Sequence, residues 1–172
     1  ADSSMGRFHY KESVGDDLFR RSIYAFWRRS VAPTAFFDAS KRRTCQVRTI
    51  RTNTPLHALT LLNDKSVLAS SYHLAKLTLN RPSDDSDRIR WLCRQILSRT
   101  PTDREVAVVK GELQGLRTYY QNEALEAENL LVPLEPLTVG GAPRPDVPAS
   151  ELAAWLLTAS TLLNLDEAQT RE

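Results

Sequence analysis

The sequence of 172 residues contains few of the side chains from which metal and redox sites are usually built. It has three histidines, His9, His57 and His73, and no two of them lie four residues apart on one helix face. Its two cysteines, Cys45 and Cys93, lack the close spacing of zinc ligands and of haem attachment motifs. The sequence therefore predicts no metal site and no haem held by this chain itself.

Other motifs of catalysis and ligand binding are missing as well. The only glycine pair, Gly140-Gly141, lies among prolines and does not lead directly into a helix, unlike a phosphate-binding loop. No Gly-x-Ser-x-Gly elbow occurs, and no catalytic residue is predicted. The longest apolar stretch, residues 152–165, is 14 residues long and contains hydroxyl and amide side chains, so we expect no membrane span. Whether the chain is an enzyme stays open, with the absences favouring a non-catalytic role.

The charge is small in total but uneven along the chain. The net charge of +2 does not indicate a nucleic-acid partner. Residues 1–65 hold 12 Lys and Arg against 6 Asp and Glu, a net of +6, whereas residues 66–172 hold 11 against 15, a net of −4. A basic N-terminal part suits either an anionic partner or an ordinary solvated surface.

Apolar periodicity predicts an all-α fold, an irregular bundle of about six helices in a single domain over residues 1–172. Residues 16–30 form the first predicted helix, with an apolar arc opposite a basic face. The arc contains Leu18, Phe19, Ser22, Ile23, Phe26 and Trp27, and the basic face contains Arg20, Arg21, Arg28 and Arg29. A long irregular connection follows, and a Pro/Gly-rich surface loop precedes the last helix. The other helices are expected near residues 55–63, 65–80, 82–99, 102–131 and 150–165.

Several helix ends can be predicted from local signals. Thr102 and Glu105 fit a capping box, and Asp84 and Asp85 suit the start of a helix. The helix that follows Thr102 is expected to run unbroken to Leu131, with Gly111 and Gly115 allowing close approach of a neighbouring helix. Ser150 is the expected cap of the last helix, which is apolar nearly all round and therefore expected at the centre of the core.

The stretch Arg-Thr-Asn-Thr-Pro-Leu-His-Ala-Leu-Thr-Leu-Leu-Asn-Asp, residues 51–64, is the densest motif of the chain. Thr54 suits an N-cap and Pro55 the first helical position, while Asn63 and Asp64 suit the end of this helix and the cap of the next. Its leucines at 56, 59 and either 61 or 62 are expected to face the core. Arg51 and Asn53 have no such local role. The residues that we therefore single out for ligand or interdomain contact are Arg51 and Asn53, together with Trp27, Arg48, Asn63 and Asp64.

Three parts of the chain together resemble a known family. They are the segment from Phe19 to Asp64, which contains this motif, the stretch Leu-Ser-Arg-Thr-Pro-Thr-Asp-Arg-Glu-Val, and the last helix. The resemblance is to the C-terminal domain of unknown function of planctomycete-type secreted, cytochrome-linked proteins, although position 57 is His where that family usually has Gln. It implies that the chain is the C-terminal part of a larger extracytoplasmic protein. Such a protein would have an upstream c-type haem segment, a companion domain and sometimes a carbohydrate-binding module. An oxidising location would favour a Cys45–Cys93 disulfide, whereas the sequence around Cys93 equally suits a buried free thiol.

Three functions follow as hypotheses. The first is a non-catalytic helical module that packs on the companion domain and exposes an apolar patch when isolated. The second is a polysaccharide-binding or polysaccharide-active domain that uses Trp27, Arg48 and Arg51, along with two neighbouring phenylalanines. The third is an electron-transfer accessory whose basic face docks the cytochrome segment.

Overall fold

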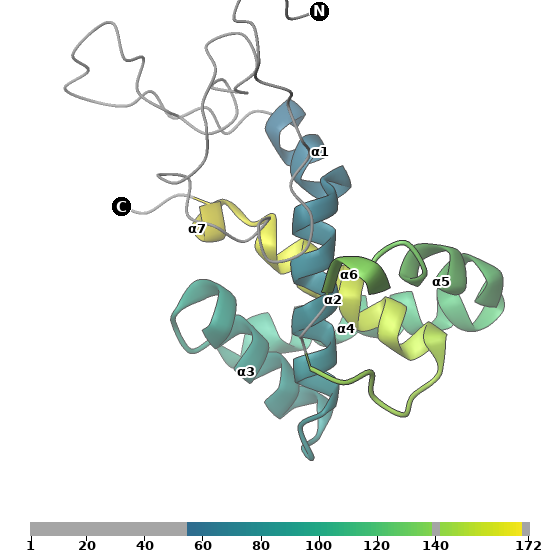
Figure 1. Cartoon of the computed structure of the whole chain (residues 1–172). Helices are drawn as coiled ribbons and strands as arrows, with labels where there is room; N and C mark the ends of the chain where they lie inside the picture. Colours follow the sequence, from purple (N-terminus) through teal and green to yellow (C-terminus); the bar gives the residue numbers. More distant parts are fainter. Residues whose placement is uncertain (1–54, 139–141, 170–172) are drawn as a thin grey trace, which may run out of the picture.

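A computed structural model describes residues 55–138 and 142–169 (Figure 1). This part is all-α and contains no strand, which confirms the fold class expected from periodicity. Within it the helices are α1 (Pro55–Asn63), α2 (Lys65–Leu79), α3 (Asp85–Leu97), α4 (Asp103–Asn122), α5 (Ala124–Leu131), α6 (Ala149–Leu163) and α7 (Asp166–Gln169). A short 3₁₀ turn, η4 (Glu135–Thr138), lies in the proline-rich connection before α6. The predicted helix over residues 16–30 lies outside the described residues.

Helix α6 is the centre of the described core. It packs against α2, α4 and α5 and also touches α3 and α7, and Figure 1 shows it running through the middle of the assembly. The sequence accounts for this position, because α6 has a single charged residue, Glu151 in its first turn, and is apolar nearly all round after it. Trp155 is its largest fully buried side chain. The central place expected for the last helix is confirmed.

Small side chains line the neighbouring helices α2 and α6. Ala69, Ser71 and Ala75 of α2 are fully buried, as are Ala154 and Ala159 of α6. Small residues let the ridges of two packed helices approach closely. Two of the buried hydroxyl groups donate to a carbonyl four residues back in their own helix, Ser71 to Val67 and Thr158 to Ala154, each at 2.9 Å. The buried hydroxyl of Ser160 on α6 has no hydrogen-bond partner in the described part of the chain. The core therefore combines close-packed small residues with a few large anchors.

Helix α2 is buried over more of its circumference than its sequence pattern indicates. The apolar pattern of residues 65–80 predicts an inward stripe of Val67, Leu68, Ser71, Leu74, Ala75 and Thr78, but Val67, Leu68 and Leu74 are only partly buried. Tyr72 and Leu79 are buried instead, because α6 covers one side of the helix while α3 and η4 cover others. The stripe was thus correct at Ser71, Ala75 and Thr78 but too narrow.

The prediction of one helix from residue 103 to residue 131 is wrong. The helix breaks at Glu123, whose backbone lies at φ −114° and ψ 59°, and α5 begins at the next residue. The amide of Glu123 donates to the carbonyl of Tyr119 and closes α4. A helix of 20 residues is already about 30 Å long, and the break lets α5 turn back so that Ala127 and Leu131 reach the core beside α6.

The expectation that Gly111 and Gly115 admit a neighbouring helix is also wrong. Both glycines are exposed, and a Cβ atom placed on either would meet nothing within 4 Å. These two glycines therefore only weaken α4.

Replacement of Gly111 or Gly115 by alanine is therefore expected to stabilise the protein. Each change should raise the free energy of unfolding by up to about 1 kcal/mol, because alanine has the higher helix propensity. Chemical denaturation of each variant and of the double variant would measure the gain, which should be nearly additive. A loss of stability at either site would show that a chain segment lies against α4 there.

Most of the predicted helix ends are confirmed. Asp64 caps α2 by accepting from the amides of Ser66 and Val67, and Asp84 caps α3 by accepting from Asp87. Thr102 and Glu105 form the reciprocal capping box at the start of α4. The predicted cap at Ser150 is wrong, because α6 already begins at Ala149, with Pro148 in front of it and no side-chain cap.

Helix α1 begins at Pro55, as the motif predicts, but its leucines do not all face inward. Leu61 is buried, whereas Leu59 is 57% exposed and Leu62 is 42% exposed. The expectation that Leu59 faces the core is therefore wrong in the described structure. The physical reason is position, since α1 packs mainly on α2 and projects beyond the rest of the bundle (Figure 1).

Candidate functional site

The residues singled out from the sequence divide into two groups. Trp27, Arg48, Arg51 and Asn53 lie outside the described residues, and so does Cys45. The polysaccharide and cytochrome-docking hypotheses depend on the basic and aromatic residues of this first group, and both hypotheses remain predictions.

The second group, Asn63 and Asp64, serves the helix ends. The Asn63 amide group donates to the carbonyl of Leu59 at 2.7 Å in the last turn of α1. The Asp64 carboxylate accepts from the amides of Ser66 at 2.8 Å and Val67 at 3.1 Å. These contacts account for both side chains by local structure, without a ligand.

The most connected charged group in the described part is Arg117 on α4. Its guanidinium donates to both carboxylate oxygens of Asp85 on α3, at 2.5 and 3.1 Å. It also donates to both oxygens of Glu151 on α6, at 2.8 and 2.5 Å. The indole nitrogen of Trp155 donates to Glu151 at 2.9 Å, and the guanidinium lies 6.0 Å from the centre of the Trp155 ring. We call Arg117, Asp85, Glu151 and Trp155 the Arg117 cluster.

The electrostatics of the Arg117 cluster keep it charged. The hydrogen bonds from Arg117 hold the pKa of Asp85 below its usual range, and those from Asp85 and Glu151 raise the pKa of Arg117. A general acid or base needs a pKa near the working pH, and neither group has one. The cluster instead joins α3, α4 and α6 through two bidentate pairs of the kind that arginine makes well with carboxylates.

A second ionic cluster joins the end of α3 to α7. Arg99 donates to Glu105 of α4 at 2.6 and 3.1 Å and to Glu167 of α7 at 2.5 and 2.8 Å. The hydrogen bond from Arg99 is the main cause that lowers the pKa of Glu105 to about 2, with further bonds from Thr102. This cluster is more exposed than the Arg117 cluster, so solvent and salt weaken it. Its geometry again serves to connect helices.

Lys76 of α2 is the one lysine among the described residues with a buried side chain, at 5% exposure. Its amine lies 4.9 Å from the centre of the Tyr72 ring, and burial lowers its pKa, while the charge of Glu135 raises it. Glu135 in turn accepts from Arg144 at 2.7 Å, and Asn80 donates to the carbonyl of Pro143 at 3.0 Å. These contacts tie the proline-rich connection to α2, so Lys76 helps to hold a loop in place.

Sequence reasoning missed Arg117 and Lys76, although both leave a signal. Arg117 lies between Leu113 and Tyr120 at helical spacing, and Lys76 lies between Tyr72 and Leu79 in the same way. A charge at an inward position of a helix is expected to have a partner. The partners themselves come from other helices, and the periodicity of one helix does not name them.

Among the residues that the structure describes, no group of three or more His, Cys, Asp and Glu side chains is placed to hold a metal ion. None of the described helices is both long and apolar enough to span a bilayer. Cys93 is buried, and burial raises the pKa of its thiol. Its pairing with Cys45 stays a prediction, because Cys45 lies outside the described residues.

The fold and these clusters define a helical module in which charged side chains connect helices. A comparison with protein families matches residues 3–113 to PSD1, described as a protein of unknown function (DUF1553). Because this match covers well over half of the chain, the protein belongs to the PSD1 family. Comparisons with curated proteins and with solved structures gave no match.

Proposed function

We propose that the chain is a non-catalytic helical module of an exported, haem-linked multidomain protein and that it packs on a companion domain of that protein. The observation that carries this proposal is the use of its charged groups. Asp85 in the Arg117 cluster and Glu105 beside Arg99 both have a lowered pKa, and the main cause in each case is a hydrogen bond from the arginine. These ion pairs connect helices of the described part to one another. These groups stay charged at neutral pH, so they support a scaffold better than a reaction.

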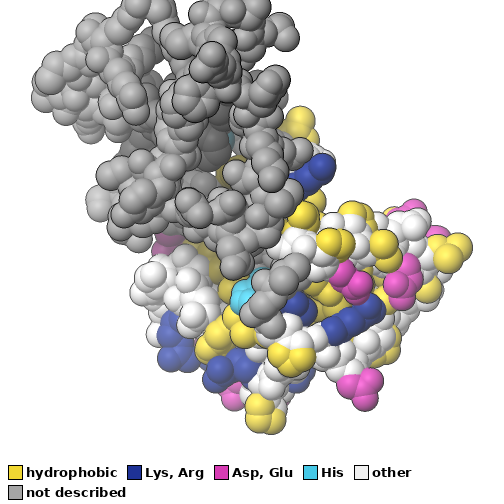
Figure 2. Space-filling view, in the orientation of Figure 1, with side chains coloured by type: hydrophobic (Ala, Val, Ile, Leu, Met, Phe, Trp, Pro, Cys, Tyr) yellow, Lys and Arg dark blue, Asp and Glu magenta, His cyan; other side chains and the backbone are white. Residues whose placement is uncertain are grey.

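The surface at the junction of α4 and α5 suits the packing contact. Leu125 is 81% exposed, Val132 is 60% exposed and Tyr119 is 48% exposed. We call these three residues the corner surface. Leu125 and Val132 are seven residues apart and therefore lie on the same face of the helical segment. Figure 2 shows hydrophobic and acidic side chains beside one another at the α5 end of the molecule.

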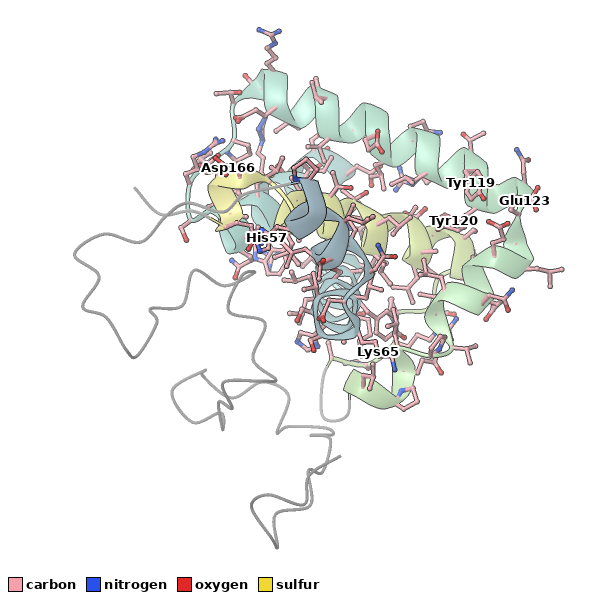
Figure 3. All side chains as sticks on the ribbon, turned by 90° about the horizontal axis from the view of Figure 1, so that it is seen from above. His57, Lys65, Tyr119, Tyr120, Glu123 and Asp166 are labelled. Atoms are coloured by element: carbon pink, nitrogen blue, oxygen red, sulfur yellow. The ribbon has the colours of Figure 1, made fainter. Side chains whose placement is uncertain are left out.

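The aromatic part of the corner surface is held in place. The Tyr119 hydroxyl donates to Glu126 across the break between α4 and α5, and the Tyr119 ring meets the Tyr120 ring edge to face at 5.1 Å between centroids. Figure 3 shows both tyrosines and Glu123 gathered at this end of the molecule. An apolar centre with a fixed tyrosine and a polar rim is the usual composition of a protein interface.

The proposal predicts an effect of charge at the corner surface. The double variant Leu125→Asp, Val132→Asp is expected to bind the remainder of the protein at least tenfold more weakly, because the interface would bury two carboxylates. Isothermal titration of the two separately produced polypeptides would measure the affinity. Val108→Asp is the matched control, since Val108 is also exposed but lies on the first half of α4.

The control variant should bind like the wild type, and all variants should keep the same melting temperature. Equal affinity of the double variant, or no association of the wild type, would argue against packing through this surface. The haem context has a separate test in the upstream sequence of the protein. A signal peptide and a Cys-x-x-Cys-His motif there would support it, and a sequence without them would contradict it.

A further inference from the structure

Helix α1 presents apolar side chains that no described element covers fully. Its nine residues include no charged side chain, and a helix of this composition is usually buried. Yet Leu59 and Leu62 are exposed, and α1 rests mainly on α2. Figure 2 shows hydrophobic side chains over α1 at the edge of the molecule. The composition of α1 therefore indicates a further covering element.

The surroundings of α1 indicate the charge of that element. Figure 1 shows α7 in the upper part of the described structure, on the side towards which α1 projects, and α7 itself packs on α3 and α6. Helix α7 opens with Asp166 and Glu167, of which Glu167 already accepts from Arg99, and Leu165 in front of it is exposed. A covering element that extends from α1 towards α7 would thus meet leucines and then the acidic start of α7, which suits an apolar stripe flanked by cations.

We propose that residues 16–30 of the same chain dock on α1 and cover Leu59 and Leu62. This N-terminal segment carries a predicted apolar arc that includes Ile23, Phe26 and Trp27, and at 100° per residue Arg20 and Arg29 fall at the two edges of this arc. The arc matches the exposed leucines, and the arginines match the acidic start of α7. The charge of the whole chain agrees, at +6 for residues 1–65 and −4 for the rest.

The chain itself provides the means for this contact. Residues 31–54 connect the N-terminal segment to α1 and reach about 80 Å when extended, at roughly 3.3 Å per residue. A helix of nine residues is only about 13 Å long, so the connection imposes no strain. The match to the PSD1 family spans residues 3–113, which places the N-terminal segment and α1 in one family unit. A tethered segment also outcompetes a second copy, because its effective concentration is high.

Hydrogen exchange of the whole chain, followed by mass spectrometry of its peptides, tests the contact from both sides. In the wild type, the amides of residues 16–30 are expected to exchange at least tenfold more slowly than in an unstructured peptide. The variant Leu59→Asp, Leu62→Asp is expected to remove most of this protection. The reciprocal variant Phe26→Asp, Trp27→Asp is expected to speed exchange in α1 by a similar factor.

Two controls make the outcome decisive. The amides of α6 should stay protected in every variant, which shows that the core is folded. The corner-surface variant Leu125→Asp, Val132→Asp should leave residues 16–30 as protected as in the wild type, so this test stands apart from the packing on a companion domain. Three results would overturn the proposal: unprotected residues 16–30 in the wild type, protection that survives both α1 substitutions, and protection that grows with protein concentration, since the last would show a second copy on α1.

Discussion

Replacing Trp155 by alanine is expected to lower the free energy of unfolding by about 4 kcal/mol. Trp155 is the largest fully buried side chain of α6, at the centre of the described core. Its removal leaves a cavity and also removes the indole donor of Glu151. For a protein of this size, the change corresponds to a fall of about 10 °C in melting temperature. Thermal and chemical denaturation would measure it.

The variant Trp155→Phe separates packing from hydrogen bonding. Phenylalanine fills most of the space but has no N–H group, so the loss should be only about 1–2 kcal/mol. If Trp155→Ala cost no more than Trp155→Phe, the ring would not be the anchor of this core.

Replacing Arg117 by alanine is the second large change, with an expected loss of about 3 kcal/mol. Arg117, Asp85 and Glu151 all have largely buried side chains, so removal of the guanidinium leaves two carboxylates without their shared partner. Arg117→Lys is expected to recover only part of the loss, because one ammonium group cannot make two bidentate pairs. Equilibrium unfolding in denaturant at neutral pH would measure both variants.

Arg104→Ala supplies the matched control, since Arg104 is an exposed arginine of the same helix α4. Its effect should stay within about 0.5 kcal/mol. Removing the charges together, as Arg117→Met with Asp85→Asn and Glu151→Gln, should restore part of the stability that Arg117→Ala loses. An effect of Arg117→Ala no larger than that of Arg104→Ala would show that the cluster does not hold the helices together.

The contribution of Arg117 should also depend on pH. Its hydrogen bonds lower the pKa of Asp85 in the folded protein from the usual value of 3.8. A carboxyl group with a lowered folded pKa adds stability above its unfolded pKa, and that stability disappears as the pH falls through the folded pKa. The difference between wild type and Arg117→Ala should therefore be full at pH 6 and shrink below about pH 4.

Most helix boundaries could be predicted from the sequence because their signals are local. Pro55 opens α1, and Asp64, Asp84 and Thr102 cap the helices that follow them. A cap depends on a side chain and amides two or three residues away, so no other part of the fold is needed to recognise it. Among the predicted caps Ser150 was the exception, since a hydroxyl residue near a helix start need not occupy the cap position.

The contacts between helices were not predictable in the same way. The inward positions of Arg117 and Lys76 are visible in the sequence, but Asp85, Glu151 and Glu135 are drawn to them from other elements. The break at Glu123 also depends on distant residues, because α5 turns back to place Ala127 and Leu131 against the core beside α6. Propensity alone favours one continuous helix there.

The sequence by itself therefore determined the all-α class, the starts of α1 to α4 and the central place of α6, since these follow from capping chemistry and apolar periodicity within a few turns of chain. Only the tertiary structure decided which helices touch, that no neighbour lies against Gly111 and Gly115, and that α1 keeps Leu59 and Leu62 on its surface. The physical reason is that burial and ion pairing depend on side chains brought together from distant parts of the chain, and no local pattern records which ones will meet.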